Sequence, residues 1–284
     1  MVSLKWVLLG SLFATAACAF AEDEDPPIVG IGGHTVTFRA TKWTMPGVES
    51  ATAWFTANGK TFPIFGADIG ADGHSNMLSP DKKTLLLDPV IFGMLSLENG
   101  EEKLESQQHC VVISMETGCV LADRWATFCV GQWKGNQWIS ADGDVLTPAL
   151  ETKSPKDLLK YVSSMEPAQS RAESIEWGLN FLSPESYMAC HPPEQNVQTY
   201  NDLGFYLAEG GKDELALKFY RGVESVGKRT VLMLNMADSL WRLDRKDEAQ
   251  RYYREYGEAM AAAGKAQKIP QRVVERSELQ GVKN

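Results

Sequence analysis

Cysteine is the residue type in this chain with the clearest chemistry. Apart from Cys18, four cysteines lie along the sequence, and an even number is typical of disulfide bonds in an exported protein. Strand-like segments flank Arg124, which favours a hairpin that places Cys119 opposite Cys129. We therefore predict the disulfides Cys119–Cys129 and Cys110–Cys190, although four cysteines allow three pairings.

A metal centre is the alternative chemistry for these residues. His109-Cys110 and Cys190-His191 offer four nitrogen and sulfur ligands, but they lack the short spacing of structural zinc sites, and export favours oxidation. Residues 68–79 have partial calcium-loop spacing, yet Gly70 has no side-chain oxygen where the third position needs one. We therefore expect neither a metal nor a cofactor.

No catalytic motif accompanies the four histidines. The sequence has no Gly-x-Ser-x-Gly, no His-Glu-x-x-His and no phosphate-binding glycine loop. The histidines do not lie beside a nucleophile in sequence, so we expect no catalytic residues. A hydrolase of the cell envelope, with a site assembled by the front part of the chain, stays as the alternative function.

The first 21 residues are typical of a signal peptide. Lys5 is followed by the apolar run Trp6 to Ala17, which is too short for a membrane span, and Ala19-Phe20-Ala21 has the small-x-small cleavage pattern. The short positive region is typical of bacteria, so we expect cleavage after Ala21 and a periplasmic protein. Lipidation of Cys18 is the alternative, and only then would we expect attachment to a membrane.

Charge is distributed unevenly along the chain. Residues 1–196 carry 13 Lys and Arg against 24 Asp and Glu, whereas residues 197–284 carry 15 against 13. Nucleic-acid binding needs clustered Lys and Arg. The acidic front part therefore argues against nucleic acid as a partner.

Residues 22–150 predict an antiparallel β domain, either a sandwich or an open barrel. His34 to Arg39 alternate in polarity, which is typical of a half-buried strand. Asn58-Gly59 and Gly135-Asn136 lie between strand-like segments and predict hairpins. Trp133 and Trp138 flank the second turn, so we expect them to pair across it. About eight short strands are expected, and the tryptophans of this part pack in the core or line a second surface.

Helical periodicity begins in residues 151–195, which we expect to be connecting helices. Ser154-Pro155-Lys156-Asp157 is an N-cap followed by a proline and an acid in the first turn. A second helix is expected from Ala168 to Leu182. The fold class is therefore α+β, with helical hairpins over residues 196–284.

Two segments of these hairpins repeat at about 33 to 34 residues. Small residues, Gly204 and Ala216 in one copy and Ala237 and Ala249 in the other, lie where paired helices must approach closely. Tyr220 and Tyr253 are expected to fill the space beside them. In order and spacing this stretch resembles the tetratricopeptide repeat family over about Val197 to Gly264, but Lys228 replaces the usual proline.

The resemblance implies a concave groove, lined by the first helix of each hairpin, that binds a peptide or partner protein. By register, its predicted partner-binding residues are Asn201, Phe205, Glu209, Asp238, Trp241 and Arg242. The lysine that grips a peptide carboxylate in this family is missing. We therefore expect a non-enzymatic protein-binding or adaptor protein, one version being an inhibitor or immunity protein for a toxic effector.

Overall fold

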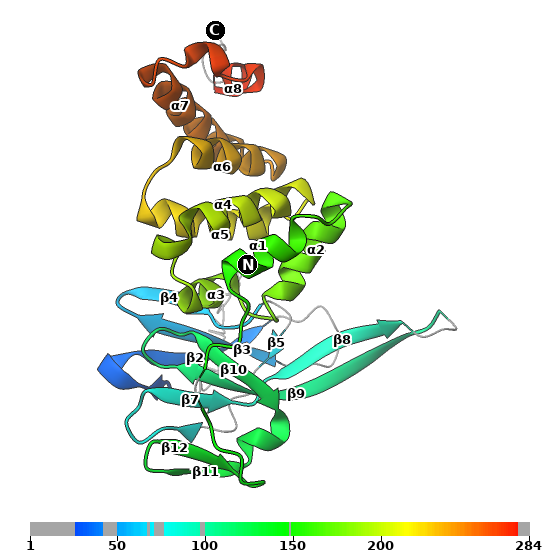
Figure 1. The fold of residues 1–284 in the computed structure, drawn as a ribbon, viewed down its shortest axis with the longest axis vertical. Coiled ribbons are helices and arrows are strands. Elements are labelled where there is room, and N and C mark those ends of the chain that lie inside the picture. Colours follow the sequence, from blue (N-terminus) through cyan, green and yellow to red (C-terminus); the bar gives the residue numbers. More distant parts are fainter. Residues whose placement is uncertain are drawn as a thin grey trace, which may run out of the picture.

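The computed structural model describes residues 26–41, 50–66, 69–70, 77–96, 100–147 and 149–277. The expected signal peptide, Cys18, and Asp68, Asp72 and Asn76 of the calcium-loop candidate lie outside these residues. The fold class is α+β, as predicted, because antiparallel sheets come first and helices follow (Figure 1). Within the described part, no helix is long and apolar enough to cross a membrane.

The β part contains two main antiparallel sheets and a separate hairpin. The first sheet has the order β1-β2-β3-β4, with β1 Ile28–Val29, β2 Thr35–Thr41, β3 Ser50–Ala57 and β4 Lys60–Pro63. The second has the order β5-β8-β9-β7-β6, and β10 also pairs with β9. Its strands are β5 Ile69–Gly70, β6 Met77–Leu78, β7 Thr84–Leu87, β8 Val90–Ser96, β9 Glu102–Ser114 and β10 Val120–Trp125. The hairpin consists of β11 Gly131–Lys134 and β12 Gln137–Ser140.

Local turn chemistry gives the hairpins that the sequence predicts. Asn58 and Gly59 connect β3 to β4 with φ angles of 51° and 73°, the left-handed values that a two-residue hairpin turn needs. Gly135-Asn136 connects β11 to β12, and Trp133 pairs with Trp138 across it, with ring centroids 5.4 Å apart. Both hairpins and the tryptophan pair are confirmed.

The two main sheets share one apolar core. Val36 and Phe55 from the first sheet pack with Leu85, Val111 and Ile113 from the second. Because β9 pairs with β8 along one half and with β7 and β10 along the other, it is the central strand of the second sheet. The outer halves of β8 and β9 project from the body as a long hairpin arm (Figure 1).

Eight helices follow in the described part: α1 Pro155–Val162, α2 Ala168–Gly178, α3 Pro184–Cys190, α4 Pro193–Glu209, α5 Asp213–Val226, α6 Thr230–Arg242, α7 Lys246–Ala262 and α8 Gln271–Ser277. The predicted cap is present, since Ser154 accepts a hydrogen bond from the backbone N–H of Asp157. The second helix ends at Gly178, four residues earlier than expected. A helix at 184–190 was not predicted, although Ser183-Pro184-Glu185 repeats the pattern that begins α1.

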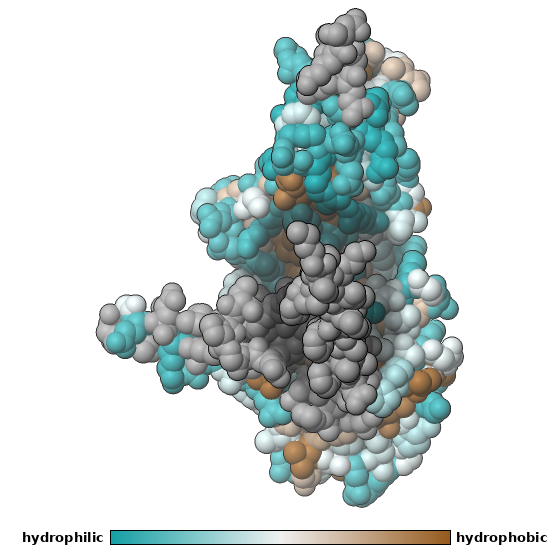
Figure 2. All heavy atoms as spheres, turned by 180° about the vertical axis from the view of Figure 1, so that it is seen from behind, coloured by the Kyte–Doolittle hydropathy of each residue, from teal (hydrophilic) through white to brown (hydrophobic). Residues whose placement is uncertain are grey.

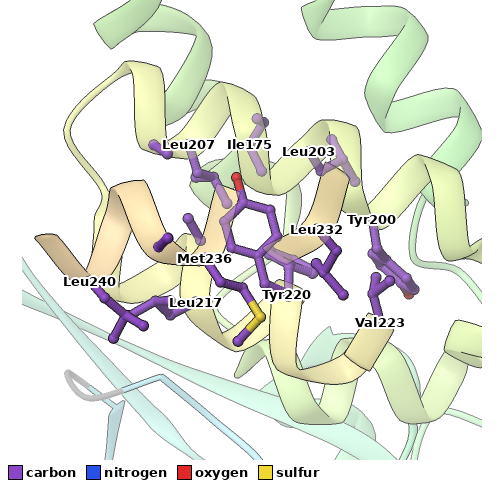
Figure 3. Packing of buried hydrophobic residues seen from close by; sticks show 14 of the residues in the cluster. Ile175, Tyr200, Leu203, Leu207, Leu217, Tyr220, Val223, Leu232, Met236 and Leu240 are labelled. Carbon is purple, nitrogen blue, oxygen red and sulfur yellow. The ribbon is translucent and has the colours of Figure 1, made fainter. Parts of the chain in front are cut away.

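Helices α4 to α7 form two hairpins whose core residues repeat at 33 positions. Leu203 and Met236, Ala216 and Ala249, and Tyr220 and Tyr253 are such pairs, and all are buried. Figure 3 shows the ring of Tyr220 among apolar side chains of neighbouring helices. A Cβ atom on Gly204 would overlap that ring, so glycine here allows α4 to approach α5 closely.

Gly204→Ala should therefore destabilise the fold by about 1 to 3 kcal/mol, because the added methyl group forces α4 away from Tyr220. Gly257→Ala is the matched control: Gly257 lies in α7 with open space around its Cα, and alanine should add up to about 1 kcal/mol through helix propensity. Urea unfolding followed by circular dichroism measures both. Equal effects of the two changes would contradict the close approach.

The disulfides are Cys110–Cys129 and Cys119–Cys190, so the predicted pairing is wrong. The expected hairpin around Arg124 does not form, because β10 runs straight through this position and pairs with β9. Cys119 and Cys129 therefore lie beyond opposite ends of a six-residue strand, which spans about 20 Å. That all four cysteines are disulfide-bonded is as predicted.

Cys119–Cys190 joins the β part to the helices at α3. Ser183 donates its hydroxyl to the carbonyl of Pro63, and Ser186 donates to the carbonyl of Gly118 at 2.9 Å. Helix α3 also packs against β4 and β10. The covalent bond and these buried hydrogen bonds hold the two parts of the chain in one arrangement.

Non-reducing peptide mapping should recover Cys110 with Cys129 and Cys119 with Cys190. Replacing both Cys119 and Cys190 by serine opens a loop of 71 residues, whereas replacing Cys110 and Cys129 opens one of 19. Loop-closure entropy predicts losses of about 4 and about 3 kcal/mol respectively. Thermal unfolding of the two double variants checks the order, and recovery of a Cys119–Cys129 peptide would overturn the pairing.

Candidate functional site

The predicted groove residues converge on a small hollow between α4 and α6. Four of the six predicted partner-binding residues line it, and a fifth lies beside it. Phe205, Glu209, Asp238 and Arg242 line a space of about 80 Å³ together with Ala208, Tyr220 and Asn235. Asn201 lies next to it, where its side-chain oxygen accepts a hydrogen bond from Asn235 at 3.1 Å. The space is large enough for the end of one side chain.

The hydroxyl group of Tyr220 is the unusual feature of this hollow. The oxygen is buried and has no hydrogen-bond partner within the described residues. Burial raises the pKa of Tyr220, so the hydroxyl keeps its proton and can donate. A buried polar group without a partner costs about 1 to 3 kcal/mol, and such groups in native proteins call for an explanation.

Arg242 forms the wall of the hollow through an ion pair. Its Nε and Nη2 donate to Asp213 at 2.9 and 2.7 Å, and Asp213 is almost fully buried. These hydrogen bonds raise the pKa of Arg242. The pair connects α5 to α6, and it holds the guanidinium group in a fixed orientation.

Helix α8 contacts Asp238, which also lines the hollow, and Trp241, the sixth predicted groove residue. Asp238 accepts hydrogen bonds from Tyr253 at 2.7 Å and from Arg272 at 2.8 Å. The guanidinium of Arg276 lies 4.6 Å from the centre of the Trp241 ring. Asp238 and Trp241 thus hold the closing helix, and Phe205 is the more exposed aromatic residue, at 43 %.

Replacing Asp238 with asparagine should cost about 2 kcal/mol, because it removes the charge from these hydrogen bonds. Burial acts to raise the pKa of Asp238, but the hydrogen bonds from Arg272 and Tyr253 outweigh it, and the pKa lies below its usual value. Its contribution is therefore complete above the unfolded-state pKa of about 4 and is lost as the pH falls through the folded-state pKa.

Urea titrations of the wild type and of Asp238→Asn between neutral and acidic pH measure this. The difference in unfolding free energy between the wild type and Asp238→Asn should approach zero at low pH. Asp244→Asn is the control, since Asp244 is highly exposed and its left-handed backbone suits asparagine. A gap that is independent of pH would contradict the role of the carboxylate.

A second hollow region lies where β10 meets α2. A space of about 370 Å³ is bounded by β10, by residues 151–153 and by Trp177, Gly178, Asn180 and Leu182. A second space of about 260 Å³ is bounded by Gln107, His109, Asp123, Arg124 and Trp125. Asp123 lines both spaces. This cleft is not predictable from local sequence patterns, because β10 and residues 177–182, which bound it, lie about 55 residues apart in the chain.

Asp123 is the central polar group of this cleft. It accepts from Nδ1 of His109 at 2.8 Å, and the amide of Asn180 lies 3.4 Å from its other oxygen. Asn180 and Phe181 both have left-handed φ angles, 50° and 56°. Such strained backbone persists where surrounding contacts enforce it, often at ligand sites. Here it places Asn180 beside Asp123 and the Phe181 ring 5.4 Å from His109.

The residues proposed as alternative metal ligands are separated and otherwise engaged. Cys110 and Cys190 belong to different disulfides, and His191 bonds to Thr152 at 3.0 Å. Burial lowers the pKa of His191. The described ranges contain no group of three or more histidine, cysteine or acidic side chains arranged to hold a metal ion.

Of the front tryptophans considered for a second surface, Trp125 is highly exposed, at 71 %. Trp138 is buried, Trp54 lies under Arg39, and Trp43 lies outside the described residues. Trp177, on α2, is 84 % exposed and was not considered. The sequence contains one indication of this exposure. Trp177 lies two residues from both Ile175 and Leu179, so it is on the opposite side of the helix from their apolar face.

Comparisons with protein-family models, with curated proteins and with solved structures find no match.

Proposed function

We propose that this is an exported, non-enzymatic binding protein that holds a partner protein through its tetratricopeptide-like hairpins. The observation that carries the proposal is the unpaired, buried hydroxyl of Tyr220 at a hollow lined by predicted groove residues. A partner group that accepts a hydrogen bond would satisfy it. Phe205, exposed at the rim, provides the apolar contact around that bond.

The same geometry defines what the partner presents. Tyr220 donates, and Arg242 has a guanidinium nitrogen, Nη1, without a hydrogen-bond partner among the described residues. Two donors in a space of about 80 Å³ suit a carbonyl or carboxylate oxygen on a short side chain. The hollow thus selects one anchoring side chain of the partner.

The acidic front part supports a basic partner. Residues 1–196 carry 11 more acidic than basic side chains, and a field of one sign speeds the capture of an oppositely charged protein. A toxic effector neutralised by an inhibitor or immunity protein is the specific version that we favour. The two disulfides are compatible with an oxidising compartment, and the signal-like residues 1–21 support export to the periplasm.

Phe205→Ala and Tyr220→Phe test the hollow. Both variants should stay folded, because Phe205 is half exposed and the Tyr220 hydroxyl has no bond to lose. The partner is first captured from periplasmic extract on the wild-type protein, identified by mass spectrometry and purified for titration calorimetry. Loss of one hydrogen bond should weaken its binding to Tyr220→Phe roughly fivefold.

Two controls sharpen this experiment. Val226→Ala changes an exposed apolar residue on α5, away from the hollow, and should bind like the wild type. Tyr200→Phe removes a bonded hydroxyl, which donates to the carbonyl of His191 at 2.6 Å, and should lower stability by about 1 kcal/mol. Partner affinity that is unchanged in both Phe205→Ala and Tyr220→Phe would reject the groove.

The alternative function, a cell-envelope hydrolase, has one supporting observation. His109 and Asp123 have the geometry of a general base and its orienting acid, beside a space of about 260 Å³. The residues that bound this space include no serine, threonine or free cysteine. Thr152, at the adjoining space, is hydrogen-bonded to His191. The binding proposal is therefore preferred.

A further inference from the structure

The cleft at β10 has the features of a ligand site distinct from the groove. Its two spaces of about 370 and 260 Å³ share Asp123 as a lining residue, and a third of about 250 Å³ shares Arg124 with the second. We refer to the surface along the end of β10 that bounds these spaces as the track. Figure 2 shows that, on the face drawn, the helical part is largely hydrophilic, while apolar residues are exposed at the β end.

Two exposed indole rings belong to this track. Trp177, 84 % exposed, bounds the largest space, and Trp125, 71 % exposed, bounds its neighbour. Large aromatic side chains gain much from burial, so two that remain accessible beside hollows are unusual in a folded protein. Flat apolar rings of this kind provide stacking surfaces for a ligand.

The charged side chains along the track are held by neighbours within the protein. Arg124 is paired with Glu151, Asp123 is hydrogen-bonded to His109, and Lys153 lies 4.4 Å from the ring centre of Tyr161. The pairing with Arg124 also lowers the pKa of Glu151. The track carries charges of both signs and no cluster of one sign, which favours a ligand recognised through its ring faces and hydroxyl groups over one recognised by its charge.

Strand addition by a peptide is disfavoured here. Residues 151–153 run beside β10, and the backbone N–H of Glu151 donates to the carbonyl of Leu121 at 3.1 Å. The edge that an extended peptide would need is thus partly occupied. The residues that line the track include the polar residues Gln107, Asp123 and Asn180.

We propose that this track binds a neutral oligosaccharide. Pyranose rings have flat C–H faces that pack on indoles, and their hydroxyl groups both donate and accept hydrogen bonds. Trp125 and Trp177 would provide the stacking contacts, and Asp123, Asn180 and Gln107 the hydrogen bonds. The strained conformation of Asn180 and Phe181 preorganises the polar centre of the site.

Titration of the mature protein with cellohexaose, chitohexaose and maltohexaose, followed by tryptophan fluorescence and by calorimetry, tests this site. At least one of these neutral chains should give saturable binding, and its affinity should not change between low and about 0.5 M salt, because the ligand carries no charge. Trp125→Ala and Trp177→Ala should each weaken binding on the order of tenfold.

Matched variants make the result specific. Trp177→Phe keeps a ring face and should retain most of the affinity, whereas Val226→Ala, remote from the track, should behave like the wild type. Folding is checked by circular dichroism, and both indoles are too exposed for their loss to unfold the protein. Absence of saturable binding to all three sugars, or binding that survives in Trp125→Ala and Trp177→Ala, overturns the proposal. Tryptophan-dependent capture of a protein without sugar binding would also overturn it.

Discussion

The attachment of α3 to the β sheets is the constraint on which the rest of the molecule depends. The Cys119–Cys190 bond fixes the C-terminal end of this helix to the start of β10, and buried serine hydroxyls fix its N-terminal end to β4 and to the turn before β10. Helix α3 has only seven residues, so its packing surface against the sheets is small. The covalent bond limits their relative motion, so that surfaces built from both parts keep their shape.

The cleft at β10 is one such surface. Asp123 and Trp125 come from a strand, whereas Trp177 and Asn180 come from the end of α2 and the residues after it. Two backbone hydrogen bonds anchor this loop to the residues that follow β4. The N–H of Gly66 donates to the carbonyl of Phe181, and the N–H of Ser183 donates to the carbonyl of Ile64. The left-handed conformation at 180 and 181 is thus held from both sides, which explains how a strained segment persists.

In the helical hairpins, several predicted partner-binding residues also stabilise the fold. Asp213 orients Arg242, and Asp238 and Trp241 hold α8. These contacts cover the end of the second hairpin with α8. The groups proposed to meet a partner are the rim at Phe205, the hydroxyl of Tyr220 and Nη1 of Arg242, so one anchoring side chain describes the proposed groove better than a long peptide channel.

The sequence by itself determined the features that depend on neighbours in the chain. These include the succession of a β part and a helical part, the turn at Asn58-Gly59, the cap at Ser154 and the small residues that repeat at 33 positions, because turn geometry, capping and helical periodicity act over a few residues. The expected number of strands, about eight, was too low, because several short strands of the structure have little sequence signal of their own. Only the tertiary structure decided the pairing of Cys119 with Cys190, the engagement of Asp238 by α8 and the cleft around Asp123. The register of β10 against β9 and the packing of the helices decide these features. Both bring together residues that are far apart in the chain, so local sequence patterns do not reveal them.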